Sequence, residues 1–69
     1  MKIFVEILKL IPNEDNNEYY LKTKTEISTL TKAQKALTDL EIASDEKKRI
    51  HKCYHDEDPK KPCEIVQRG

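Results

Sequence analysis

The residues with the clearest potential for chemistry are two histidines and two cysteines in the second half of the chain. His51 and His55 are four positions apart, Cys53 lies between them, and Cys63 follows. On a helix, residues four apart share a face, so the two histidines could bind one zinc ion, for which thiolates are also suitable ligands. Cys53 would then point about 160–200° away around the helix. Because a fourth ligand is also missing, we predict no metal and no cofactor, with both histidines solvated and Cys53 packed as a small apolar group.

Catalytic motifs have little support in this sequence. Nucleophilic catalysis by Cys and His requires a thiolate, a base and an orienting residue in a pocket, and a chain of 69 residues leaves little room for one. A glycine-rich phosphate loop is excluded, because the single glycine is Gly69. The acidic segment 56–58 lacks the alternating ligand spacing of a calcium loop, so we interpret it as a solvated turn. The protein is therefore predicted not to be an enzyme.

One short segment is strongly basic, with four cations at Lys47, Lys48, Arg49 and Lys52. Such a group could contact phosphates, so a small nucleic-acid-binding or regulatory protein is one candidate. Acidic residues at 45–46 and 56–58 flank the segment and weaken its field. We therefore favour a solvated, charge-compensated helix face, on which Lys48, Arg49 and Lys52 are candidates for protein contacts.

Aromatic residues are scarce, with one Phe, three Tyr and no Trp. Tyr19 and Tyr20 are adjacent, so in a strand their side chains would point to opposite faces. We expect one of them to serve the core. Tyr20, beside Lys22 and Lys24 on the polar face, is a candidate interface anchor.

The elements that position these side chains follow from apolar periodicity. Residues 2–11 are rich in β-branched residues and apolar on both faces, which favours a central strand over a short amphipathic helix. Residues 19–27 predict a second strand with one solvated face. The polar segment 12–18 predicts a hairpin loop with a mobile tip. Residues 63–67 predict a short final strand.

An apolar ladder in the middle of the chain predicts helix. Its members recur at steps of three and four residues, interrupted by the polar Lys47: Ala33, Ala36, Leu40, Ala43, Ile50 and Tyr54. The helix should run from residue 30 to 42 and again over 47–54. Segment 44–46 resembles a second helix N-terminus, so one long helix and two shorter ones both fit. The length of a continuous helix, about 39 Å, favours a break. Three hydroxyl residues are candidate N-caps: Ser28, Thr29 and Thr31.

The predicted fold is one small α+β domain over residues 1–69, with the element order β-β-α-(α)-β. The strands should form a three-stranded antiparallel sheet, order 2-1-3, with helix packed on one face. Its expected core consists of eight aliphatic residues: Ile3, Val5, Ile7, Leu21, Leu37, Leu40, Ile50 and Ile65.

The charge balance argues against two classes of protein. The 13 basic and 13 acidic residues give a net charge of zero, whereas nucleic-acid-binding domains usually carry a basic excess and nucleic-acid mimics an acidic one. No stretch approaches the roughly 20 apolar residues of a membrane helix, and the start of the chain lacks a signal-peptide cleavage site. We expect a cytoplasmic protein with reduced thiols, whose small core would benefit from partner binding or dimerisation.

The last ten residues, Lys60–Gly69, carry a family resemblance. Compact, charge-dense β-β-α-β chains of this size look like small phage proteins that inhibit a host or defence enzyme. Within that group, this segment resembles the end of the Dmd antitoxins of T-even phages (discriminators of mRNA degradation). The lysine pair, Cys-Glu, the aliphatic that follows and the final Arg-Gly fall in matching positions. The likeness is loose in the first strand and its turn and absent in the helix, and this chain is longer and lacks tryptophan.

The resemblance implies a protein that blocks a host endoribonuclease toxin by binding it. We therefore expect a non-catalytic phage protein that inhibits a nuclease-type bacterial target in the host cytoplasm, either as a monomer or as a homodimer. The alternatives are the nucleic-acid-binding protein described above and an anti-CRISPR protein. The candidate contact residues are Tyr20, Lys22, Lys24, Lys48, Arg49 and Lys52.

Overall fold

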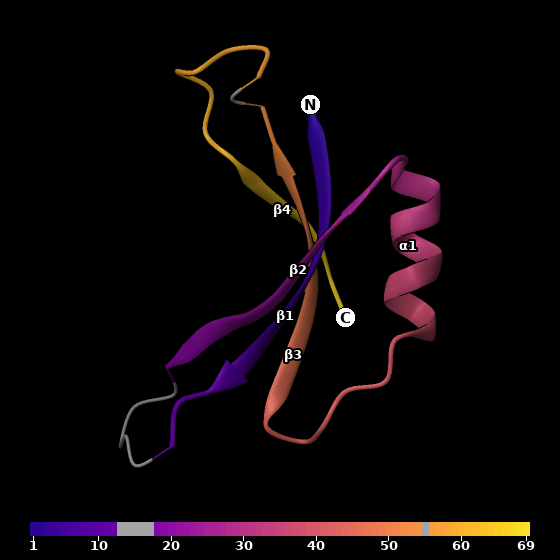
Figure 1. Ribbon diagram of the computed structural model, residues 1–69, viewed down its shortest axis with the longest axis vertical. Helices are drawn as coiled ribbons and strands as arrows, with labels where there is room; N and C mark the ends of the chain where they lie inside the picture. The colour runs from indigo at the N-terminus through magenta and orange to yellow at the C-terminus, as the bar shows by residue number, and fades with distance from the viewer. Residues whose placement is uncertain (13–17, 55) are drawn as a thin grey trace.

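The computed structural model describes residues 1–12, 18–54 and 56–69. Within these residues, one helix lies against one face of a four-stranded antiparallel sheet (Figure 1). In chain order, the elements are β1 (Lys2–Leu10), β2 (Tyr19–Ile27), α1 (Leu30–Asp39), β3 (Glu46–Cys53) and β4 (Glu64–Arg68). The strands lie side by side in the order β2-β1-β3-β4. The central strands are therefore β1 and β3, and the edges are β2 and β4.

The predicted α+β class and the predicted strands are confirmed. β1 and β2 match the expected segments to within one residue, and the expected final strand is β4. The predicted central position of β1 is also correct, because an antiparallel neighbour lies on each side of it. The predicted mobile tip of the first hairpin falls on residues 13–17, outside the described residues.

The prediction of helix over 47–54, and with it the three-stranded sheet, is wrong. This segment is β3, and it pairs along its whole length with β1. Ile50 is its one fully buried side chain, so the segment has no apolar stripe of its own. Because β1 is a central strand, its backbone N–H and C=O groups need hydrogen-bond partners on both edges, and β3 supplies those of the second edge. Tertiary pairing thus overrides the weak local helix signal.

The chain leaves the helix at Leu40, which has an extended backbone (φ −76°, ψ 120°). A turn then leads into β3, in which the Glu46 amide donates to the Ala43 carbonyl at 3.1 Å. The Glu46 carboxylate accepts a hydrogen bond from the Ala43 amide at 2.8 Å. This turn is the segment 44–46 that was expected to start a second helix. Its Glu46 side chain does accept a hydrogen bond from a backbone amide, but it does so where a strand begins.

The core lies between α1 and the two central strands. Its buried apolar residues are Ile3, Val5, Ala33, Leu37 and Ile50. Four of the eight predicted core residues are among them. Ile7, Leu40 and Ile65 are half-buried instead.

Leu21 was predicted in the core but is 46% exposed, because a β-bulge interrupts the pairing of β1 with β2. Ile7 pairs with Thr23, whereas the next residue, Leu8, pairs with Leu21. Lys22 is therefore the extra residue of β2. One inserted residue moves all side chains beyond it to the opposite face, so Leu21 points away from the helix.

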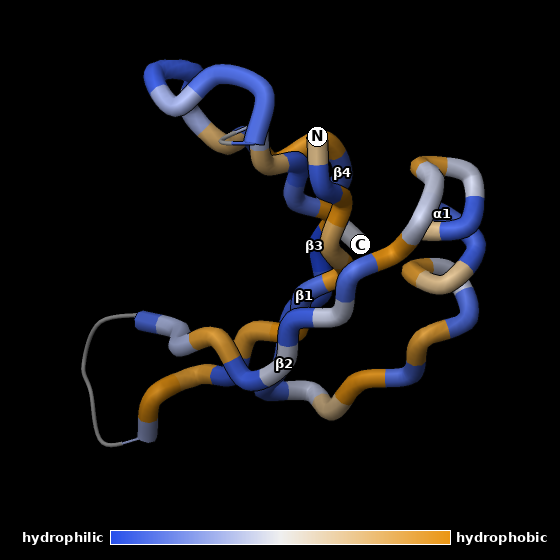
Figure 2. The backbone as a smooth tube through the Cα atoms, turned by 45° about the horizontal axis from the view of Figure 1, so that its top comes forward, coloured by the Kyte–Doolittle hydropathy of each residue, from blue (hydrophilic) through white to orange (hydrophobic). Residues whose placement is uncertain are grey.

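The molecule is open for its size. Its radius of gyration is 13.1 Å, compared with about 11 Å for a typical domain of this length. Its accessible surface is 5032 Å², compared with about 4,500 Å² from the usual scaling with mass. Its extents of 39 × 29 × 15 Å describe an elongated, flat shape, and Figure 2 shows the helix on one side of the sheet. No helix in the described part of the chain is long and apolar enough to cross a membrane.

Replacing Thr29 with alanine should lower the free energy of unfolding by about 1 kcal/mol. Thr29 is the N-cap of α1, and its hydroxyl accepts a hydrogen bond from the Lys32 amide at 3.2 Å. Thr31→Ala is the matched control, because Thr31 is exposed inside the helix, where alanine is the better helix former. Urea denaturation should show a loss for the first variant alone. Equal losses would mean that Thr29 does not cap the helix.

Candidate functional site: the open face of the sheet

The sheet face opposite α1 carries the functional candidates, and we call it the open face. Val5 and Ile50 pair with each other and point to the helix, so their strand neighbours point the other way. The pairing registers place the following residues on the open face: Phe4, Glu6 and Leu8 from β1, Leu21, Lys24 and Glu26 from β2, Lys47, Arg49 and His51 from β3, and Ile65 and Arg68 from β4. Apolar and charged side chains therefore mix across it, and the cations outnumber the two carboxylates.

A buried carboxylate lies at the centre of the open face. Glu6 is only 2% exposed, although it lies on the side without the helix. Its Oε1 accepts a hydrogen bond from Arg49 Nε at 2.8 Å, and its Oε2 lies 3.3 Å from His51 Nδ1. Burial by itself would raise the pKa of Glu6, but the hydrogen bonds and charges of Arg49 and His51 outweigh burial and lower this pKa.

This arrangement makes Glu6 a structural group and not a proton acceptor. A general base needs a pKa near the working pH and a free lone pair directed at its substrate. Glu6 has a lowered pKa, and both of its oxygens are engaged by side chains of β3. Its charge therefore serves to neutralise Arg49 within the sheet. Among the described residues, no buried side-chain nitrogen or oxygen lacks a hydrogen-bond partner.

Two lysines of the open face lie over aromatic rings. The Lys24 ammonium is 4.2 Å from the centre of the Phe4 ring, and the Lys47 ammonium is 4.6 Å from the centre of the Tyr19 ring. Such contacts hold a cation on an apolar surface while it stays accessible to an anionic partner. Both lysines are exposed. The open face therefore presents positive charge next to apolar area.

A basic hollow of about 230 Å³ lies where β3 begins and β4 ends. Its lining consists of Leu8, Lys47, Lys48, Arg49, Arg68 and Gly69. Two of these cations are already engaged: the Lys48 ammonium donates to the Leu40 carbonyl at 2.8 Å, and Arg49 binds Glu6. The charge that the hollow offers to a partner therefore comes from Lys47 and Arg68, which are both exposed.

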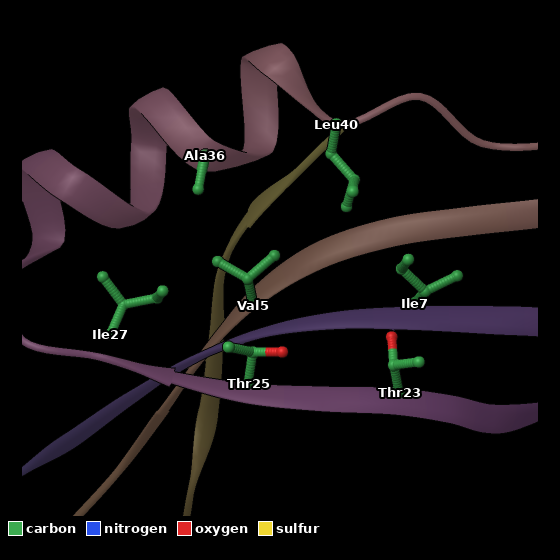
Figure 3. Close-up of a pocket in the computed structure, with 7 residues that line it drawn as sticks. All are labelled: Val5, Ile7, Thr23, Thr25, Ile27, Ala36 and Leu40. Atoms are coloured by element: carbon green, nitrogen blue, oxygen red, sulfur yellow. The ribbon is translucent and has the colours of Figure 1, made fainter.

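A second hollow, of about 200 Å³, opens on the helix side of the sheet. Figure 3 shows Thr23 and Thr25 on β2 pointing toward the helix beside Val5 and Ile7, with Ala36 and Leu40 above them. The short side chains of Thr23, Thr25 and Ala36 leave this space unfilled. Among the described residues, none that lines this hollow is charged, so the described lining offers no acid, base or anion-binding group for a reaction.

The structure divides the predicted contact residues between the two faces. Lys48 and Lys52 lie on the helix side and Arg49 on the open face, because strand alternation replaces the predicted helix face. Lys24 also lies on the open face. The helix face predicted for the three cations of this segment is therefore wrong, and their role as contact residues stays a prediction.

The remaining two predicted contact residues, Lys22 and Tyr20, lie near the β-bulge. The Lys22 ammonium binds the Glu46 carboxylate at 2.6 Å. This ion pair raises the pKa of Lys22 and lowers that of Glu46. Tyr20 is 45% exposed at the edge of the sheet and pairs with Lys9, the strand neighbour of the open-face residue Leu8, so it belongs to the helix side and not to the open face.

The histidines and cysteines are arranged differently from the sequence prediction. His51 contacts Glu6, and His55 lies outside the described residues. Cys53, at the end of β3, accepts a hydrogen bond from the thiol of Cys63 at 2.9 Å. Among the described residues, no three His, Cys, Asp or Glu side chains form a group that could hold a metal ion. The predicted solvated turn at 56–58 is exposed, and two of its carboxylates accept hydrogen bonds from the Met1 amino group.

Sequence reasoning missed the role of Glu6 and the closeness of the two cysteines. A signal for Glu6 exists: it is an acidic residue inside a strand that is apolar on both faces, which requires a cationic partner on a neighbouring strand. The contact between the two cysteines depends on the pairing of β3 with β4. It could not be predicted while residues 47–54 were expected to be helical.

Comparisons with protein-family models, with curated proteins and with solved structures find no match for this chain. The likeness of its last ten residues to the Dmd antitoxins therefore stays a prediction, and the open face is the feature from which a function can be argued.

Proposed function

We propose that this chain is a non-catalytic binding protein that inhibits a bacterial nuclease-type enzyme by covering it with the open face of its sheet. The observation that carries the proposal is this face itself: a central sheet surface, without a covering helix, on which half-buried apolar side chains mix with exposed cations. The phage origin and the antitoxin role implied by the sequence belong to the same proposal.

The exposed area of the molecule supports binding to a partner. Among the described residues, five apolar ones are buried, and the accessible surface exceeds the usual value for this mass by about 500 Å². A partner that covered the open face would remove Leu8, Leu21 and Ile65 from water. Both edge strands also offer backbone groups to a partner, and Tyr20 lies on one of these edges.

The charge of the open face indicates the chemistry of the partner. Lys24, Lys47 and Arg68 are exposed and lie on one face, so a complementary protein surface is acidic with an apolar centre. Nuclease active sites that bind metal ions carry clustered carboxylates. Inhibition would follow when the cations pair with these carboxylates and the apolar residues fill the surrounding groove.

A second candidate function is single-stranded nucleic-acid binding by the same face. The observation that favours it is the placement of Phe4 and Tyr19 beside lysines, since aromatic rings flanked by cations are typical of such surfaces. Two observations weigh against it: the net charge is zero, and the buried Glu6 neutralises Arg49 at the centre of the face.

Capture and inhibition together test the proposal. The purified chain is used as bait in a lysate of toxin-bearing bacteria, the captured protein is identified and purified, and its RNA cleavage is measured with increasing amounts of the chain. We expect a stoichiometric complex and complete loss of cleavage at one equivalent. Binding of the chain alone to RNA is measured in parallel at about 50 and 200 mM salt.

The alternative has a distinct signature in the same assays. A face that contacts about four phosphates should lose on the order of 50-fold in RNA affinity over that fourfold salt range. Tight, salt-sensitive RNA binding together with unchanged cleavage would overturn the inhibitor proposal in favour of nucleic-acid binding.

A further inference from the structure

The end of β3 and the start of β4 bring two cysteines into direct contact. Lys52 pairs with Glu64 in the antiparallel register, so Cys53, the last residue of β3, and Cys63, directly before β4, occupy the next position outward. Their sulfur atoms are 2.9 Å apart, with the Cys63 thiol donating to Cys53. Side chains at opposed positions of antiparallel strands have Cβ atoms about 4.5–5.5 Å apart, which approaches the range that a disulfide requires.

The surrounding loop holds the two cysteines at this position. The Tyr54 hydroxyl donates to the Glu64 carboxylate at 2.7 Å and bridges the same two chain segments. Backbone hydrogen bonds run from the amides of Glu57 and Asp58 to the Tyr54 carbonyl. The amide of Lys61 donates to the Asp58 carbonyl at 3.0 Å. The described residues between the cysteines, Tyr54 and 56–62, are therefore organised before any bond between the cysteines forms.

We infer that Cys53 and Cys63 are a redox modification site, at which a low-molecular-weight disulfide converts the two thiols into an intramolecular disulfide. One cysteine thiolate attacks a sulfur of glutathione disulfide and displaces one molecule of glutathione. The second cysteine thiolate then attacks the mixed disulfide and displaces the other glutathione. The two cysteines lose two protons and two electrons, and the glutathione disulfide gains them as two thiols.

The bond would fasten the weakest strand of the sheet. β4 has five residues, pairs only with β3, and its register is interrupted by a bulge. A covalent link at the N-terminal end of β4 limits fraying of this strand. It also closes a loop in the unfolded chain and so lowers the conformational entropy of the unfolded state. Oxidation is therefore expected to stabilise the domain, and this part of the inference does not depend on what the open face binds.

The reactivity of the site is expected to depend on pH. The hydrogen bond to Cys53 and burial raise the pKa of the Cys63 thiol, and only thiolates attack disulfides. Both cysteines are half-buried, so a small reagent can reach them. Exchange should therefore be faster in alkaline buffer.

The test compares the full chain with its cysteine variants after incubation with glutathione disulfide in alkaline buffer. For the parent chain we expect a mass about 2 Da lower, no remaining reaction with a maleimide, and a melting temperature about 10 °C higher than for the reduced chain. Cys53→Ser and Cys63→Ser should instead each accumulate a single mixed disulfide with glutathione. The double variant should melt at the same temperature with and without the oxidant.

Two results would overturn the inference. If the parent chain retains two maleimide-reactive thiols, or accumulates mixed disulfides and covalent dimers as the single variants do, the cysteines are not a disulfide site. If the intramolecular bond forms but the melting temperature is unchanged or lower, the bond does not fasten β4. Far-UV circular dichroism of the double variant shows whether the comparison is made between folded proteins.

Discussion

Replacing Leu37 with alanine should lower the free energy of unfolding by about 2–5 kcal/mol. Leu37 is 2% exposed and is the largest side chain that α1 places in the core. Its removal loses buried apolar area and leaves a cavity between α1 and the central strands. A domain of this length has a total stability of about 3–10 kcal/mol, so the variant should be largely unfolded at 37 °C.

Leu40→Ala is the matched control for this prediction. Leu40 belongs to the apolar ladder and is a predicted core residue, but it is half-buried and borders the hollow on the helix side. Its truncation should lower the free energy of unfolding by about half as much as Leu37→Ala, or less. Less apolar area is lost, and the site is already partly open to solvent. Urea denaturation of both variants measures the difference. Equal losses, or a larger loss for Leu40→Ala, would contradict the described packing of α1.

Replacing Glu6 with glutamine should lower the free energy of unfolding by about 2–4 kcal/mol at neutral pH. The side chain of Arg49 is only 26% exposed and that of His51 18%, so the substitution leaves a partly buried cation without its counter-ion. Glu26→Gln is the control, since Glu26 belongs to an edge strand and is exposed. It should change the stability by less than about 0.5 kcal/mol.

Glu6 also predicts how stability depends on pH. Its pKa in the folded chain is lower than its ordinary value, so its ionised form favours the folded state above the unfolded pKa of about 4.3. This contribution is lost as the pH falls below that value and through the lower, folded pKa. Thermal melts between about pH 7 and pH 2 should show that Glu6→Gln loses less stability on acidification than the parent. A parallel decline of both proteins would contradict the described contacts of Glu6.

The strands and the helix start that the sequence predicted have strong local signals. β1 is rich in apolar, β-branched residues on both faces, and β2 alternates between a partly apolar and a polar face. The helix begins directly after Thr29, which caps it. These features depend on residues close together in the chain, which is why periodicity and capping rules recover them.

The features that the sequence did not predict depend on long-range pairing. β3 contains one fully buried apolar residue, Ile50, and becomes a strand because β1 has a free edge. The β-bulge at Lys22 reverses the orientation of Leu21, and no local composition marks it. The open face combines Lys24, Arg49 and Arg68 from three strands. Its composition can therefore be derived only after the strand order and registers are known.

The most direct test of the open face as the binding surface compares two double charge reversals in a titration against the purified target. Lys47→Glu/Arg68→Glu alters exposed cations of the open face, and Lys32→Glu/Lys35→Glu alters exposed lysines of α1. After thermal melts confirm that both are folded, the first variant should lose at least about tenfold in affinity, equivalent to about 1.4 kcal/mol, and the second less than about twofold. Unchanged binding by the first variant, or the larger loss in the helix variant, would contradict binding through the open face.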